Sequence, residues 1–68
     1  MHDPAQLRAL EAILRLGAFE AAAADLHVTP SAISQRIRAL EDAVGGPLIL
    51  RGQPCAATAT GARLARHA

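Results

Sequence analysis

The chain has 68 residues, of which 51% are hydrophobic and 19% are charged, and its formal net charge is +1. A chain of this length buries only about 60% of its unfolded surface, so it forms one small domain and leaves no room for an enzyme-sized cleft. Its hydrophobic content excludes a disordered chain, and the sequence contains no carboxylate pair, nucleophile–base arrangement or phosphate-binding glycine loop, so we expect a compact helical domain that is not an enzyme.

The first predicted helix begins at Pro4. Asp3 before it is typical of an N-cap with proline at the first helical position. Gly17 is expected to end this helix. One side of the helix carries an apolar stripe suited to a core, formed by Leu7, Leu10, Ile13 and Leu14.

A short second helix is predicted from Phe19 to Leu26. Its four consecutive alanines, Ala21 to Ala24, favour helix and allow a neighbouring helix to approach closely. At least two of the four are expected only to favour the helix, without a packing role. Phe19, the single aromatic residue, is expected to anchor the core.

A turn must follow the second helix, because Pro30 lacks an N–H and disfavours helical geometry at Thr29. Thr29 can then cap a third helix that begins at Pro30 and ends near Val44. Two helices joined by a turn of three or four residues form the helix-turn-helix arrangement.

The third helix is expected to have an apolar side and a polar side. At about 100° per residue, a seam for the core is formed by Ile33, Ile37, Leu40 and Val44. The opposite side gathers Ser31, Ser34, Gln35, Arg38 and Asp42, with Arg36 on a flank. Small hydroxyls let the backbone approach DNA, glutamine forms paired hydrogen bonds to adenine, and arginine reaches guanine or phosphate. A merely solvated polar face would show the same periodicity.

A β-hairpin is predicted after the Gly-Gly-Pro segment that ends the third helix. Its strands are expected over residues 48–50 and 55–57, joined by a turn at residues 51–54. A hairpin in this position forms the wing of a winged helix, and Arg51 is the candidate to enter an adjacent minor groove. The alternative is that Arg51 faces a phosphate or only solvent.

A fourth helix is expected to run from about Ala59 past Leu64, capped by Thr58 or Thr60. No stop signal follows, and we therefore expect this chain to be the front portion of something longer. The predicted fold class is mostly α, a winged helix-turn-helix with a three-helix core and a short hairpin.

Charge is divided unevenly along the chain. Residues 1–30 carry two arginines against four carboxylates, whereas residues 31–68 carry five arginines against two carboxylates. All basic residues are arginine, which suits forked contacts to phosphate and guanine better than lysine does. The basic part is the part that contains the candidate reading helix, although scattered surface arginines would give the same count.

No metal, disulfide or membrane partner is expected. Cys55 is the single cysteine and the three histidines are scattered, so no spacing matches a zinc site. The N-terminus lacks a charged segment followed by an apolar one, and no uncharged apolar stretch reaches about 18 residues. The sequence therefore predicts a cytoplasmic protein without a cofactor.

Several segments together resemble the N-terminal DNA-binding domain of LysR-type transcriptional regulators. Within that group, the Gly-Ala-Phe-Glu segment, the run from Ser31 to Ile37, and Pro54-Cys55 with Ala57-Thr58 and Gly61 are similar to the branch that controls lysine and arginine export. The resemblance extends from about Leu7 to Leu64. It implies a winged helix-turn-helix domain over residues 1–58 and the start of a truncated dimerisation or linker helix over residues 59–68.

The resemblance also implies roles for single residues. Family positions that match the start of the third helix face bases in the major groove, Arg36 and Arg38 contact base edges or phosphate, Arg51 serves the wing, and Thr58 caps the linker helix near the DNA backbone. Close packing between the two helices of the motif is assigned to Ala22 and Ala23. The candidate DNA-binding residues are Thr29, Pro30, Ser31, Ser34, Gln35, Arg36, Arg38, Arg51 and Thr58.

Two departures from the family limit what the resemblance implies. Many relatives have glutamine at the position of Pro30, so readout of that base is in doubt. We expect the effector-binding domain and most of the pairing helix to be absent from this chain. Family members bind promoter DNA as dimers of dimers and contact RNA polymerase, whereas this chain is expected to be a monomer or weak dimer with poor affinity for a half-site. A competing hypothesis is a protein–protein module that docks through its alanine-rich second helix.

Overall fold

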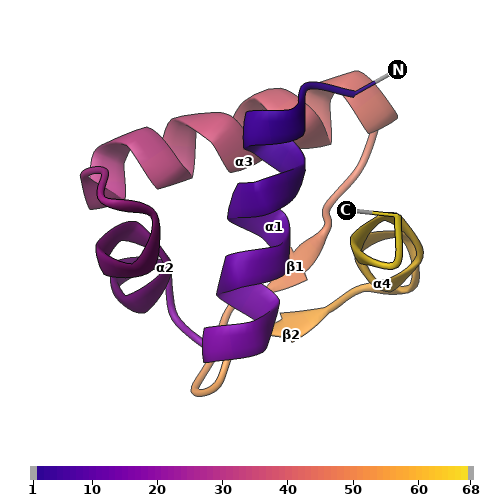
Figure 1. Cartoon of the computed structure of the whole chain (residues 1–68). Coiled ribbons are helices and arrows are strands. Elements are labelled where there is room, and N and C mark those ends of the chain that lie inside the picture. Colours follow the sequence, from indigo (N-terminus) through magenta and orange to yellow (C-terminus); the bar gives the residue numbers. More distant parts are fainter. Residues whose placement is uncertain (1, 68) are drawn as a thin grey trace.

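The computed structural model describes residues 2–67 and contains four helices and one two-stranded sheet in that range (Figure 1). The elements in chain order are α1 (Pro4–Leu16), α2 (Phe19–Leu26), α3 (Pro30–Val44), β1 (Ile49–Leu50), β2 (Ala56–Ala57) and α4 (Ala59–Ala65). Helix α1 crosses α3, with α2 on one side and α4 on the other. The predicted mostly α winged helix-turn-helix is confirmed; the outer limits of the predicted domains, Met1 and Ala68, lie outside the described residues.

The helix ends follow the capping signals in the sequence. The Asp3 carboxylate accepts a hydrogen bond from the Ala5 N–H at 2.8 Å, and the Thr29 hydroxyl accepts one from the Ala32 N–H at 3.0 Å. Each bond satisfies a backbone donor that has no partner within its helix. Gly17 ends α1 with a φ of 84°, in the left-handed region that favours glycine.

The buried core lies among α1, α2, α3 and the start of the hairpin. Ala22 and Ala23 of α2 are buried, as their predicted packing role requires, and a larger side chain at either position would push neighbouring elements apart. Phe19 is half-buried and packs against this core. The buried residues are Ala9, Leu10, Ala12, Ile13, Ala22, Ala23, Ile33, Ile37, Leu40, Leu48 and Ile49.

The strands are one residue shorter than predicted, because the backbone of the residue before each strand bonds elsewhere. The Leu48 N–H donates to the Glu41 carboxylate at 2.9 Å, and the Cys55 N–H donates to the Gly17 carbonyl at 2.8 Å. The remaining pairs, Ile49 with Ala57 and Leu50 with Ala56, form an antiparallel hairpin. The hairpin is thereby attached to α3 at one end and to the α1–α2 turn at the other.

Thr58 joins the hairpin to α4. Its hydroxyl accepts a hydrogen bond from the Gly61 N–H at 3.0 Å and donates one to the Pro47 carbonyl at 2.9 Å. Its backbone N–H also donates to the Leu48 carbonyl at 3.1 Å. Of the two threonines that the sequence offered as caps, Thr58 is therefore the one that caps α4.

We expect Thr58→Val to lower the free energy of unfolding by about 2 kcal/mol, because the variant loses a helix cap and the hydrogen bond to Pro47 while it keeps the side-chain shape. Thermal and urea unfolding would measure the change. Thr58→Ser should restore most of the stability, and Thr60→Val, at an exposed position two residues further along, should change it by less than about 0.5 kcal/mol. Equal losses at both threonines would contradict the assigned cap.

An ion-pair cluster connects α1 to α2. The Arg15 guanidinium lies 2.9 Å from a Glu11 carboxylate oxygen and 3.0 Å from an Asp25 carboxylate oxygen. Hydrogen bonds to Glu11 and then to Asp25 raise the pKa of Arg15 above its ordinary value. The pairs are about half exposed, so they orient the two helices more than they stabilise them. The Arg15 guanidinium is thus paired with carboxylates of the domain itself.

Candidate nucleic-acid interface

One side of α3 presents polar side chains to solvent. Ser31, Gln35 and Arg38 are exposed, and Ser34 is half-buried beside them. They face away from the core because Ile33, Ile37 and Leu40, on the other side of the same helix, are buried. The structure thus confirms the predicted division of α3 into an apolar side and a polar side, and it brings these four candidate residues together.

Arg36 does not belong to this polar face. At 100° per residue it lies about 140° around the helix from Ser31 and much nearer to the buried Leu40. Its side chain is half-buried, whereas Arg38 is exposed. A groove-filling contact by the polar face would therefore leave Arg36 at the margin, where a phosphate is a more accessible target than a base edge.

The N-terminal end of α3 carries two further candidates, Thr29 and Pro30, both exposed. The Thr29 hydroxyl uses an acceptor position for the Ala32 N–H, and its own proton stays available for donation to an outside acceptor. The preceding turn contains His27 with a φ of 58°, a left-handed conformation that non-glycine residues seldom adopt. Both candidates therefore lie beside the tight turn that joins α2 to α3.

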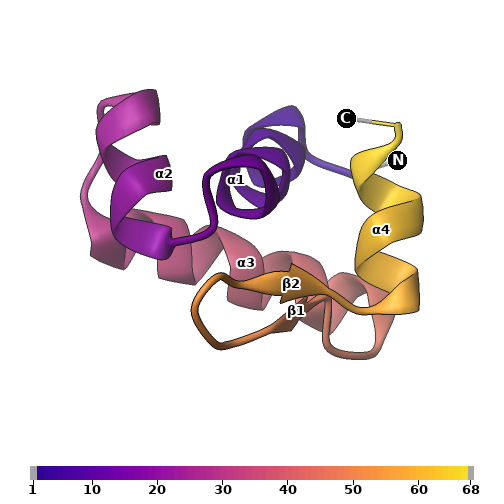
Figure 2. The same ribbon diagram turned by 90° about the horizontal axis from the view of Figure 1, so that it is seen from below.

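The hairpin and α3 lie on the same side of α1 (Figure 2). Arg51 directly follows β1 and is exposed at the start of the hairpin loop. Its guanidinium carbon lies 4.2 Å from the centroid of the Phe19 ring, at the start of α2. The wing arginine is therefore in contact with the helix-turn-helix and does not extend alone into solvent.

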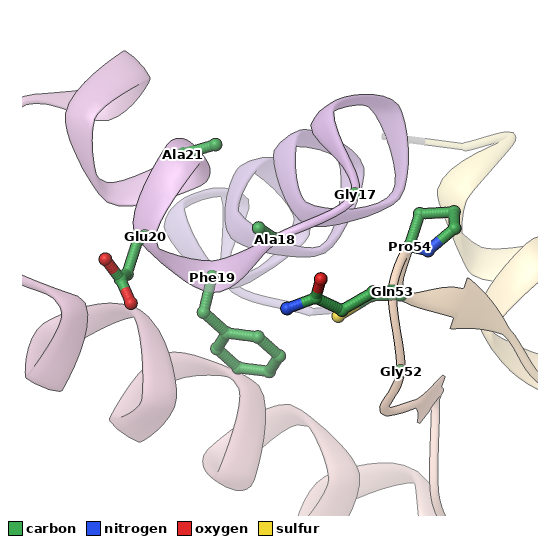
Figure 3. A pocket seen from close by; sticks show the side chains of 9 residues that line it. Gly17, Ala18, Phe19, Glu20, Ala21, Gly52, Gln53 and Pro54 are labelled. Carbon is green, nitrogen blue, oxygen red and sulfur yellow. The ribbon is translucent and has the colours of Figure 1, made fainter.

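An open depression lies between the α1–α2 turn and the hairpin loop (Figure 3). The Phe19 ring forms part of its lining, and the Gln53 side chain points toward Ala18 and Phe19 from the opposite side. The peptide bond between Gln53 and Pro54 is cis. Cys55, a free cysteine, is half-buried in the same lining. Among the other lining residues, Glu20 carries a carboxylate and is exposed.

Thr58 occupies a different kind of position from the other candidates. Its only hydroxyl proton is directed to the Pro47 carbonyl, and one of its acceptor positions is taken by the Gly61 N–H. A phosphate oxygen accepts hydrogen bonds and does not donate them, so this hydroxyl cannot bind phosphate while these bonds are intact. Thr58 thus shapes the junction between the hairpin and α4.

The arginines near the polar face are not neutralised. Across residues 2–67, Arg15 is the arginine that forms salt bridges with carboxylates, whereas Arg36, Arg38 and Arg51 form none. Unpaired arginines keep their charge and their in-plane donors for an anionic partner. In the same part of the chain no three His, Cys, Asp or Glu side chains are grouped to hold a metal ion, and no helix has the length and apolar character to cross a membrane.

Sequence reasoning missed one member of the site. Phe19 was expected only as a core residue, yet its ring also supports Arg51. The two residues are far apart in the chain, and no spacing rule connects an aromatic at a helix start to an arginine after a strand. A pairing of this kind becomes visible only once the hairpin is folded against α2.

Comparison with known proteins identifies the family to which this chain is similar. The family model for bacterial regulatory helix-turn-helix proteins of the lysR family matches residues 4–62. The HTH-type transcriptional regulator LysG of Mycobacterium tuberculosis is 56% identical over 66 residues, which cover 97% of this chain and 22% of that protein. The chain thus spans less than a quarter of the length of this relative.

Solved structures agree with the sequence relatives. Full-length LysG from Corynebacterium glutamicum superposes with a TM-score of 0.95 at 43% identity, covering 98% of this chain and 23% of that one. A crystal structure of the CbnR DBD in complex with DNA gives a TM-score of 0.86 at 31% identity, covering 93% of this chain and 74% of that one. The chain therefore belongs to the lysR family of bacterial regulatory helix-turn-helix proteins.

Proposed function

We propose that this chain is the DNA-reading domain of a LysR-type transcriptional regulator and binds double-stranded DNA in a sequence-specific manner. The observation that carries the proposal is the exposed polar side of α3, which lies on the same side of the molecule as a hairpin with an unpaired arginine. The match to a family member solved with DNA supports it. The activity is binding rather than catalysis, consistent with relatives that are transcriptional regulators.

In this proposal α3 enters the major groove with its N-terminal half. Gln35 has an amide that can form paired hydrogen bonds to adenine, and Ser31 and Ser34 are small, so they let the helix backbone come close to the bases. Pro30 offers an apolar contact to a thymine methyl in place of a side-chain hydrogen bond. Sequence is read by these positions.

The surrounding contacts fix the domain on the phosphate backbone and at the wing. Arg38 binds phosphates or base edges along the groove, Arg36 binds a phosphate at its margin, and the free proton of the Thr29 hydroxyl can be donated to a phosphate. Arg51 enters the minor groove that lies next to the major groove occupied by α3. Thr58 contributes by holding the hairpin against α4, near the backbone.

We further propose that the regulator controls export of basic amino acids in the bacterial cytoplasm. The relative from Corynebacterium glutamicum is a lysine export transcriptional regulatory protein, 46% identical over 66 residues. Effector sensing, pairing of subunits as a dimer or tetramer and contact with RNA polymerase belong to the full-length protein. We propose that residues 1–58 form the reading domain, that residues 59–68 begin the linker helix, and that the 68-residue chain by itself is a monomer or weak dimer.

The competing protein-docking function is less well supported. It requires the alanine-rich face of α2 as a contact surface, yet Ala22 and Ala23 are buried inside the domain. Only Ala21 and Ala24 retain exposure, and two methyl groups provide little area for a partner. The unpaired arginines around α3 also favour an anionic partner.

The test is fluorescence-anisotropy binding of the chain to a duplex library at about 50 and 200 mM salt. We expect a selected half-site that binds more tightly than random duplex, with affinity that falls steeply as salt rises, because each phosphate contact releases counterions. Selection of no sequence by a folded domain would overturn the proposal and favour the docking function.

Arg38→Gln separates phosphate contacts from base contacts. If Arg38 binds phosphate, the variant should bind all duplexes more weakly, and the slope of log affinity against log salt should become shallower by about 0.9. Arg8→Gln, which removes an exposed arginine from α1, is the matched control and should leave the slope nearly unchanged. An unaltered slope in Arg38→Gln would remove this residue from the phosphate contacts.

A further inference from the structure

We propose that Phe19 is a positioning residue for DNA binding, because its ring holds the guanidinium of Arg51 in the orientation that the wing requires. This inference rests on the proposed DNA-binding function and adds a residue to it. Phe19 itself need not touch DNA. Its role is carried out through Arg51, across the contact between α2 and the hairpin loop.

The first evidence is the geometry of the pair. The Arg51 guanidinium carbon lies 4.2 Å from the centre of the Phe19 ring, well within the range in which a cation is attracted to the face of an aromatic ring. Within residues 2–67 no carboxylate forms a salt bridge with Arg51. The aromatic ring is thus the group that orients this cation.

The second evidence is the form of the contact. An aromatic ring attracts a cation through its π face and offers it no carboxylate oxygen to bind. Contact with Phe19 therefore leaves N–H donors of the exposed Arg51 free for phosphate or base atoms. A carboxylate partner would have occupied the same donors that DNA needs. The ring restrains the arginine without competing for its ligand.

The third evidence is that the ring is fixed relative to the hairpin. The Cys55 N–H donates to the Gly17 carbonyl at 2.8 Å, which ties the end of the hairpin loop to the turn just before Phe19. Pro54 packs closely against this turn: a Cβ added at Gly17 would lie 2.9 Å from the Cβ of Pro54. The α1–α2 turn and the hairpin loop are therefore held together, which keeps Phe19 at a fixed position relative to Arg51.

A free arginine loses rotamer freedom when it binds, and a side chain already restrained loses less. The attraction of an exposed cation to a ring corresponds to about a two- to fivefold change in affinity. We expect Phe19→Leu, which keeps an apolar side chain but removes the ring, to weaken binding to the selected duplex by about this factor. Phe19→Tyr keeps the ring and should bind like the unchanged chain.

A double-mutant cycle with Arg51→Ala provides the decisive test, measured by anisotropy on the same selected duplex. We expect Phe19→Leu to weaken the unchanged chain and to have no further effect when Arg51 is already alanine. Equal effects of Phe19→Leu in both backgrounds would overturn the inference, and so would an unchanged affinity in Phe19→Leu. Leu14→Ala, at a half-buried position on α1 that packs on the core, controls for lost stability and should show no coupling to Arg51→Ala.

Two kinds of failure can be told apart in this experiment. If the unchanged chain shows no selective duplex binding, the proposed function fails and the inference fails with it. If the unchanged chain binds selectively but the cycle shows no coupling, only the positioning role of Phe19 is overturned. Circular dichroism at the binding temperature confirms that each variant compared is folded.

Discussion

The triple variant Ser34→Ala/Gln35→Ala/Arg51→Ala should bind its selected duplex at least about 100-fold more weakly than the unchanged chain. A single good base contact contributes about 1–3 kcal/mol of discrimination, and the variant removes two reading positions on α3 together with the wing arginine. A hundredfold loss corresponds to about 3 kcal/mol, which lies within the sum of these contributions. The residual binding should be that of a domain that holds phosphates without reading bases.

Anisotropy with the selected duplex and with a scrambled duplex measures both parts of this prediction. Affinity for the two duplexes should become equal in the triple variant, since non-specific binding depends on charge rather than on Ser34 and Gln35. The matched control is Gln6→Ala/Arg8→Ala, which removes one glutamine and one arginine from α1. A triple variant that stays folded and keeps its preference for the selected duplex would show that α3 and the wing are not the reading surface.

Gly61→Ala should destabilise the domain, although alanine is the better helix former. In α4 the added methyl would overlap the carbonyl of Leu48, with its Cβ 2.9 Å from the carbonyl carbon. Leu48 cannot withdraw easily, because its N–H is bound to Glu41 and its carbonyl to Thr58. Overpacking against fixed backbone costs about 1–3 kcal/mol or more, which exceeds the gain of about 1 kcal/mol in helix propensity.

We expect a net loss of about 1–2 kcal/mol, seen as a decrease in Tm of roughly 5–15 °C for a domain of this size. Gly46→Ala is the matched control, because a Cβ at Gly46 would meet nothing within 4 Å. That variant should change stability by no more than about 0.5–1 kcal/mol, with either sign. A Gly61→Ala variant as stable as the unchanged chain would mean that α4 can shift away from Leu48 without loss.

The helices were predictable because their signals are local. Asp3 with Pro4 and Thr29 with Pro30 start helices through side chains that bond within three residues, and Gly17 ends α1 through its own backbone conformation. The period of about 3.6 residues then divides α3 into a buried and an exposed side. These features depend on neighbours along the chain, and the structure confirms them.

The strand limits and the choice of cap were not predictable in the same way. Leu48 lies in an apolar run that predicts a strand, yet its N–H is bound to the Glu41 carboxylate. Thr58 and Thr60 are chemically equal candidates, and the carbonyl of Pro47 distinguishes them. In each case the deciding partner lies seven or more positions away along the chain.

The DNA-reading surface also combines features set by local sequence with features set by contacts between distant residues. The sequence by itself determined four helices with a hairpin, a helix-turn-helix and a polar side on α3, since capping, turn chemistry and helical period act over a few residues. Only the tertiary structure decided that Arg51 rests on Phe19 and that the Thr58 proton is taken by Pro47. Those outcomes depend on how elements pack across the core, and packing brings together residues that no local pattern connects.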